Sequence, residues 1–182
     1  MSSRLSICIF IPESKIVHSL TELLGGDRYH LHILNTDTEL RTFVVNNKEN
    51  LDCLIILKND LSSSIISEFY EQGLILPVII IDLDSSLPYQ NDDLDQQFSF
   101  NYSHSHQEEN HIYHTAEVRI NLAQLANINN FIDKALSQFL HLAPTCSISE
   151  SPDSQITLKQ IEEKQNFLLL QQRRLAEKLK ER

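Results

Sequence analysis

The chain has 182 residues and a formal net charge of −10 at pH 7, and this charge is spread unevenly. Residues 150–182 hold six acidic and seven basic residues and carry +1, so residues 1–149 carry −11. An acidic domain repels phosphate backbones, which argues against binding of nucleic acid. No run of about 18 apolar residues occurs, so we expect no membrane span. Three cysteines without a CxxC pair indicate a reduced, cytoplasmic protein.

Strand-like and helix-like segments alternate from the start of the chain. The apolar run Leu5–Ile11 predicts a strand that is buried on both faces, and Ser14 is a candidate N-cap of the helix that follows. Tyr29–Leu34 alternates as a short strand, and Asp37 is a candidate cap of a helix that extends through Asn46. The first 50 residues thus predict two successive β-α units.

The same alternation continues to about residue 142. Leu51–Leu57 and Leu76–Asp82 predict a third and a fourth strand, and Ala116–Ile120 predicts a weaker fifth. Leu61–Gln72 and Ile128–Leu142 show the apolar spacing of amphipathic helices. Together these elements predict an α/β fold with a five-stranded parallel sheet in the flavodoxin-like order 2-1-3-4-5, as in receiver domains.

One helix of that fold has no counterpart in the sequence. Residues 83–111, where a fourth helix is expected, hold six acidic residues, no Lys or Arg, and few apolar residues. We therefore predict a long loop in place of the helix. The predicted domains are a receiver-like domain over 1–142, a linker over 143–155, and a helix over 156–182 that leads into a carboxy-terminal domain absent from this chain.

The final helix carries a partial heptad seam. Ile161, Leu168 and Leu175 recur every seven residues, and Leu179 falls on a companion position. Such a seam is typical of a helix that packs against a partner, so we predict partner binding through these four side chains.

The carboxyl ends of the strands are where an open α/β sheet binds its ligands. A phospho-accepting receiver needs two acids after its first strand to hold a divalent cation, an Asp at the end of the third, a Ser or Thr at the end of the fourth and a Lys at the end of the fifth. Here Glu13 is the one acid after the first strand, Leu57 ends the third, and Asp82 ends the fourth. An aliphatic side chain cannot attack a phosphoryl group, so we predict no enzymatic activity and no catalytic residue. Asp60 is the nearest candidate for a relocated acceptor.

Two polar clusters could bind a metal but have simpler explanations. His104, His106, His111 and His114 have a spacing that can bind zinc, and residues 92–95 form an acidic run. Nothing in their surroundings preorganises the histidines, and the acidic run lacks the glycine and terminal glutamate of a calcium loop. We predict solvated loops and no metal site. Arg173 and Arg174 could meet an acidic partner, or Arg173 could pair with Glu177 within the helix.

Seven segments, in order along the chain, carry a resemblance to a known family. They are SICIF (Ser6–Phe10), DRYHL (Asp27–Leu31), LDCLI (Leu51–Ile55), EQGLILPVIII (Glu71–Ile81), YHTAEVRI (Tyr113–Ile120), QFLHLAP (Gln138–Pro144) and QQRRLAEKLKER (Gln171–Arg182). Together they resemble the amino-terminal half of the KaiA family of cyanobacterial circadian clock proteins, whose first domain is a pseudo-receiver.

The resemblance implies a non-enzymatic regulatory or input module of the circadian oscillator. In that family a carboxy-terminal four-helix domain dimerises and grips a peptide loop of the clock kinase KaiC, which stimulates KaiC autophosphorylation. The implied partners are therefore KaiC, KaiB and a second copy of the chain. We predict no cofactor, although the family's first domain has been linked to oxidised quinone. Two alternatives stay open, namely a receiver with a relocated acceptor and a sensor of quinone or another small ligand.

Overall fold

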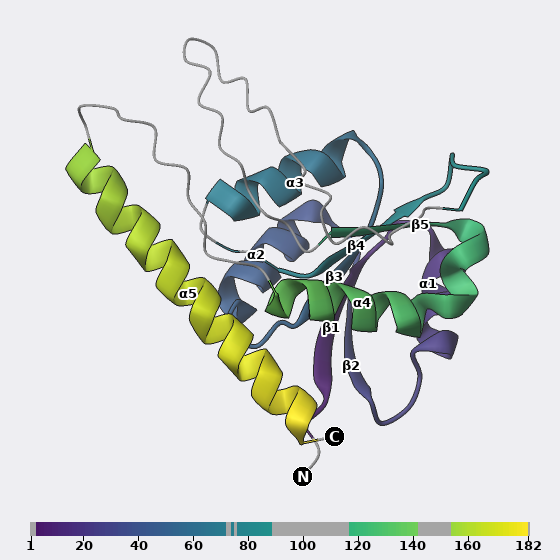
Figure 1. Cartoon of the computed structure of the whole chain (residues 1–182). Helices are drawn as coiled ribbons and strands as arrows, with labels where there is room; N and C mark the ends of the chain where they lie inside the picture. The colour runs from purple at the N-terminus through teal and green to yellow at the C-terminus, as the bar shows by residue number, and fades with distance from the viewer. Residues whose placement is uncertain (1–2, 72–73, 75, 89–116, 142–153, 182) are drawn as a thin grey trace.

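The computed structural model describes residues 3–71, 74, 76–88, 117–141 and 154–181 (Figure 1). Five strands form one sheet in the order β2-β1-β3-β4-β5, and every neighbouring pair is parallel. This confirms the predicted fold class and strand order. In chain order the elements are β1 (Leu5–Phe10), α1 (Ser14–Leu23), β2 (Tyr29–Leu34), α2 (Asp37–Asn47), β3 (Cys53–Leu57), α3 (Asp60–Glu71), β4 (Val78–Asp82), β5 (Glu117–Asn121), the 3-10 helix η1 (Leu122–Asn127), α4 (Ile128–Leu140) and α5 (Ser154–Lys180).

Two apolar layers cover the two faces of the sheet. Side chains alternate between the faces along a strand, so Ile7 and Ile9 of β1 pack in one layer while Cys8 and Phe10 pack in the other. The first layer includes buried residues of α1 and α4, and the second includes buried residues of α2 and α3. β1, β3 and β4 are therefore buried on both sides, as their continuous apolar runs predict.

The starts of two helices differ from the predicted ones. Ser14 is the first residue of α1 rather than its cap, and the N-cap position is taken by Glu13 without a side-chain hydrogen bond. α2 is capped by Thr36, not by Asp37. The Thr36 hydroxyl accepts from the Glu39 amide at 3.2 Å, and the Glu39 carboxylate accepts from the Thr36 amide at 3.3 Å. This reciprocal capping box satisfies two amide groups, which a single Asp37 cap would not do.

Strand and helix ends in the second half shift by one or two residues. β4 begins at Val78 rather than Leu76, because the preceding Pro77 has no amide hydrogen to donate to a neighbouring strand. β5 spans Glu117–Asn121, and the 3-10 helix η1 that follows it was not predicted. The side chains of Asn121 and Gln124 form a second capping box that starts η1.

Some predictions concern residues outside the described ranges. Most of the predicted loop 83–111 and of the predicted linker 143–155 lies there, and so does the fourth-helix position. α5 begins at Ser154, two residues before the predicted start of the last helix. Among the described helices, none has the length and apolar character needed to cross a membrane.

Candidate functional site

The carboxyl ends of β3 and β4 carry a hydrocarbon and an ion pair. Leu57 is partly buried, lies in register with Ile81 and packs against the apolar layer that includes α1 and α4. Asp82 is 2% exposed, and its carboxylate accepts from Lys58 Nζ at 2.8 Å and from the Asp84 amide at 3.0 Å. The acid at the end of β4 therefore already has a cationic partner from the residue after β3.

At the other strand ends, the polar side chains are exposed or form hydrogen bonds at the starts of helices. Glu13 is exposed at the start of α1, and Asn121, which is 2% exposed, is occupied in capping η1. Asn59 exchanges hydrogen bonds with Ser62 at the start of α3, at 2.7 Å and 3.0 Å. The side chain of Asp60 lies outside the described part of the chain. These contacts fix where the helices begin after β3 and β5.

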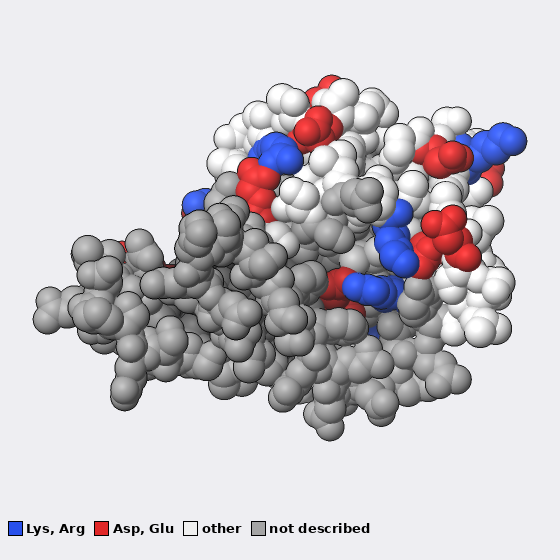
Figure 2. Space-filling view, turned by 90° about the horizontal axis from the view of Figure 1, so that it is seen from above, with Lys and Arg blue, Asp and Glu red and all other residues white. Residues whose placement is uncertain are grey.

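No described group at these strand ends is arranged as a metal centre. Within the described residues, no three His, Cys, Asp or Glu side chains gather in a way that could hold a metal ion. The predicted histidine cluster (His104, His106, His111 and His114) and the acidic run 92–95 lie outside the described ranges. Seen from above, the described surface shows acidic and basic side chains next to one another rather than in large patches of one sign (Figure 2).

The opposite, amino-terminal end of the sheet is covered by α5. Leu168 is 4% exposed and Leu175 is 1% exposed, and both belong to the apolar layer that includes β1 and α4. Leu179 is partly buried against the same layer. The seam predicted for a partner therefore packs on the chain's own domain, while the side chain of Ile161 lies outside the described part. Contact of this seam with another protein stays a prediction.

Polar side chains of α5 also bind backbone groups of the domain. Gln172 Nε2 donates to the carbonyl of Phe139 at the end of α4, at 2.7 Å. Gln171 Nε2 donates to the carbonyl of Lys48, which follows α2, at 3.3 Å. α5 thus touches the last turns of helices from both faces of the sheet, which fixes its position across the strand ends (Figure 1).

A buried carboxylate forms the centre of this contact. Asp52, just before β3, has a fully buried side chain that accepts from the Ser6 amide at 2.8 Å and from Lys178 Nζ at 2.7 Å. Arg174 Nη1 lies 2.9 Å from the other carboxylate oxygen, although its hydrogen does not point at that oxygen. Arg174 Nη2 donates to the Leu51 carbonyl at 3.1 Å. We call Asp52, Arg174 and Lys178 the Asp52 clasp.

The Asp52 clasp was not predicted from the sequence, although a signal for it exists. Arg174 and Lys178 are four residues apart and lie on the helix face of Leu175, where a solvent-exposed pair would not be expected. Asp52 stands alone at the start of an apolar strand. Buried charges are paired in folded proteins. An isolated acid on an apolar strand and two basic residues on an apolar helix face are therefore candidate partners.

Comparison with known proteins places the chain in a family. The model of the amino-terminal domain of circadian clock protein KaiA matches residues 5–144. The chain belongs to the KaiA family. This confirms the family resemblance found in the sequence, and with it the assignment to cyanobacterial circadian rhythm proteins.

Full-length members of the KaiA family align with the whole chain. Relatives from Picosynechococcus sp. and Synechocystis sp., each named circadian clock oscillator protein KaiA, are 32% identical over 182 residues. These alignments cover 100% of this chain and 56% of each relative. A KaiA protein from Synechococcus elongatus is 28% identical over 184 residues, which cover 100% of this chain and 57% of the relative. The chain thus spans about half the length of the curated KaiA proteins it matches.

Proposed function

We propose that the chain is a non-enzymatic regulatory module of the circadian oscillator that acts through protein–protein contacts. The observation that carries this proposal is the chemistry of the strand ends. Leu57 offers no nucleophile at the end of β3, and Lys58 already neutralises Asp82 at the end of β4. A receiver fold with these groups keeps surfaces that can contact other proteins, but it lacks the arrangement of side chains that accepts a phosphoryl group.

The resemblance to KaiA supports a more specific role. As part of an activator of KaiC autophosphorylation, the module would regulate an activating domain that the other half of its relatives supplies. KaiC and KaiB are the proposed partners, and a second copy of the full-length protein would bind through its carboxy-terminal part. The relatives carry the name circadian clock oscillator protein, which is compatible with this role.

Phosphoryl transfer tests the non-enzymatic part of the proposal. The chain is incubated with radiolabelled acetyl phosphate and magnesium beside an active receiver domain as positive control. We expect label on the control and none on this chain. Label that is lost in Asp82→Asn or Asp60→Asn would show a relocated acceptor and overturn the proposal. Magnesium-dependent binding of beryllium fluoride, seen as NMR shifts around these two residues, would have the same meaning.

A KaiC assay tests the regulatory part. Residues 1–182 alone are expected to leave KaiC autophosphorylation unchanged, because the proposed activating domain is in the other half of the relatives. The same residues joined to the carboxy-terminal half of the Synechocystis relative are expected to stimulate it. Stimulation by residues 1–182 alone would place an activating surface within this module and contradict the division of roles.

Binding of oxidised quinone is an alternative that rests on the family resemblance only. Titration of the labelled chain with a soluble benzoquinone, followed through backbone amide shifts, would separate a ligand sensor from a module that acts by protein contacts alone. Saturable shifts clustered in one part of the sheet–helix boundary would favour the sensor.

A further inference from the structure

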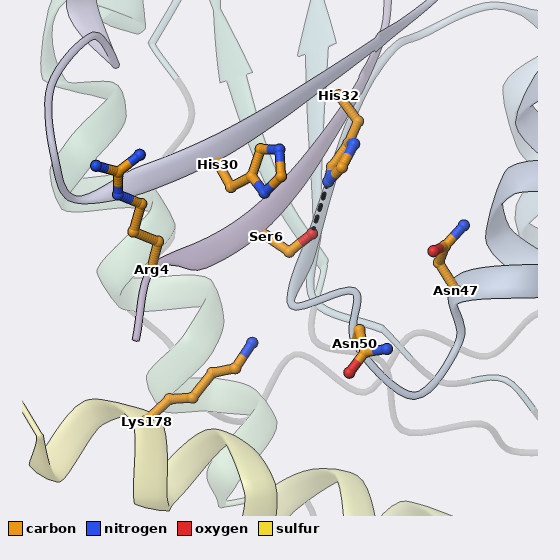
Figure 3. A pocket seen from close by; sticks show the side chains of 7 residues that line it. All are labelled: Arg4, Ser6, His30, His32, Asn47, Asn50 and Lys178. Atoms are coloured by element: carbon orange, nitrogen blue, oxygen red, sulfur yellow. Dashed lines mark hydrogen bonds between the residues drawn. The ribbon is translucent and has the colours of Figure 1, made fainter. Parts of the chain in front are cut away.

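A polar hollow lies at the amino-terminal end of the sheet, beside the edge strand β2. Its volume is about 660 Å³. Four basic side chains line it, namely Arg4, His30, His32 and Lys178, together with the neutral donors Ser6, Asn47 and Asn50 (Figure 3). Within the described part of the chain, no acidic side chain is among the lining residues. We call this hollow the β2–α5 pocket.

The charged groups around the pocket carry a positive net charge. Two cations, Arg174 and Lys178, share the single carboxylate of Asp52, which leaves one excess positive charge in the clasp. Arg4 pairs with Asp27 at 3.0 Å, but Arg4 is half exposed and Asp27 is fully exposed, so water screens this pair strongly. In a chain whose net charge is −10, the charges around this hollow favour an anion locally.

The histidines add donors at the wall of the pocket. The rings of His30 and His32 lie 4.4 Å apart, and His32 Nε2 lies 3.1 Å from the Ser6 hydroxyl. Burial, and then the neighbouring His30, lower the pKa of His32, so two charges side by side are disfavoured without a counter-ion. An anion between the rings and Lys178 would supply that counter-ion.

The donors come from four separate parts of the chain. Arg4 precedes β1, the two histidines lie on β2, Asn47 ends α2, and Lys178 reaches in from α5 (Figure 3). Lys178 is the lining residue that α5 supplies, so it contributes to the pocket only while α5 is docked. Any ligand that contacts Lys178 therefore stabilises the docked position of α5.

We propose that the β2–α5 pocket binds a phosphate group, and that binding strengthens the docking of α5. Guanidinium, ammonium, imidazole and amide N–H groups are the usual donors to phosphate oxygens. The volume is in the range of small-molecule sites, about 300–1,000 Å³, and exceeds what a free phosphate ion would fill. The ligand class is therefore a small phosphomonoester, with free phosphate as the other source of the same chemistry. This inference does not depend on the proposed clock function.

NMR titration of the whole labelled chain, in a buffer without phosphate, tests the proposal. The probes are inorganic phosphate, glycerol 3-phosphate and adenosine 5′-monophosphate, with adenosine as the control that lacks the phosphate. We expect saturable shifts of the amides around Ser6, His30 and Lys178 with the phosphomonoesters and none with adenosine. Equal affinity for inorganic phosphate would assign the site to the free ion, which keeps the phosphate chemistry. Shifts with adenosine alone, or none up to 10 mM of any probe, would overturn the proposal.

Matched variants test the residues. Arg4→Gln and His30→Gln are each expected to weaken binding about tenfold or more, because each removes a charged or polar hydrogen bond. Arg173→Gln and His18→Gln are the controls, since both residues are exposed and neither lines the pocket. Equal affinity in all four variants would overturn the assignment of the site.

Hydrogen exchange tests the coupling to α5. A saturating phosphomonoester is expected to slow amide exchange over residues 166–180 in the unsubstituted chain. Lys178→Gln is expected to weaken binding and to remove this protection, while Lys180→Gln, at an exposed position on the same helix, keeps both. Binding without any change in the exchange of α5 would contradict the coupling.

Discussion

At the scale of single residues, Asp52 links the domain to α5. Its carboxylate is fully buried and accepts from one backbone amide and from an ammonium group, with a guanidinium beside it. A buried charge is tolerated when such partners compensate its lost hydration. Because Arg174 and Lys178 both come from α5, the partners leave together when the helix undocks, and the carboxylate must then regain water.

The first prediction removes this charge. Asp52→Asn leaves two cations at the amino end of the sheet without their counter-ion, so we expect a loss of about 3 kcal/mol in the free energy of unfolding. The measurement is urea denaturation followed by circular dichroism. Asp27→Asn serves as control, since Asp27 is fully exposed and its substitution should leave the free energy of unfolding almost unchanged. Equal stability of both variants would show that the Asp52 clasp contributes little.

Sequence reasoning identified some of these residues and missed others. The groups at the ends of β3 and β4 could be predicted, because Leu57 and Asp82 end strands whose apolar runs are clear. The ion pair between Lys58 and Asp82 could not, since it depends on two strand ends being neighbours in space. The role of Asp52 could not be predicted for the same reason, because its cationic partners Arg174 and Lys178 are more than 120 residues away in the sequence.

At the scale of elements, α5 is the helix whose packing the sequence left most open. Its heptad spacing indicates the face that is buried, and Leu168 and Leu175 are indeed buried there. The spacing could not say what covers that face, because an apolar seam fits a partner and the chain's own domain equally well. The capping box of α2 explains why the predicted start of this helix was off by a residue, because Thr36 caps it in place of Asp37.

The second prediction tests the docking of α5. The double substitution Leu168→Asp and Leu175→Asp places two carboxylates in the apolar layer, so we expect α5 to detach while the sheet stays folded. Hydrogen exchange should become fast over residues 166–180 and remain slow in β1, β3 and β4. A double substitution of Leu169 and Leu170 to Asp is the matched control, because these residues lie on the same helix and are 49% and 62% exposed.

Two outcomes would count against this view of α5. Slow exchange of α5 in the buried double variant would show that its polar contacts suffice for docking. Loss of protection in the exposed control as well would show that the helix itself, rather than its packing, is the weak element. Sedimentation of the buried variant should also be compared with that of the unsubstituted chain, since self-association through the seam stays a prediction.

At the scale of the whole molecule, different contacts cover the two ends of the sheet. At the carboxyl ends of β3 and β4, Lys58 forms an ion pair with Asp82. At the amino ends, α5 packs on the sheet and contacts both apolar layers. Strand order and layering followed from the alternation of elements, since right-handed crossovers leave few topologies. The structure thus combines a predictable scaffold with contacts that only the folded chain reveals.

The third prediction uses two buried thiols as reporters of the two layers. Cys8 packs with α2 and α3, Cys53 packs in the layer of α1 and α4, and both are buried. Burial raises the pKa of Cys8 to about 12, and burial together with the Asp52 charge raises the pKa of Cys53. In a Cys146→Ser background we expect neither thiol to react with an aromatic disulfide reagent at pH 8 until urea unfolds the chain, because the thiolate is the reactive form.

Single-cysteine versions, made with Cys8→Ala or Cys53→Ala, separate the two layers. If the layers unfold together, both thiols become reactive at the same urea concentration, which should match the transition seen by circular dichroism. Reaction of Cys53 at lower urea than Cys8 would instead show that the layer of α1 and α4 opens first. Rapid labelling of either thiol without urea would contradict the buried placement.

The position of α5 also brings distant parts of the chain together. Arg4 and Lys178 line one hollow, and Figure 1 shows the start of β1 near the last turn of α5. A donor dye near the first strand and an acceptor dye after Lys180 would transfer energy efficiently while the helix is docked and poorly once it swings away. The efficiency of energy transfer would therefore report whether α5 is docked, and it could be followed in real time as clock proteins are added.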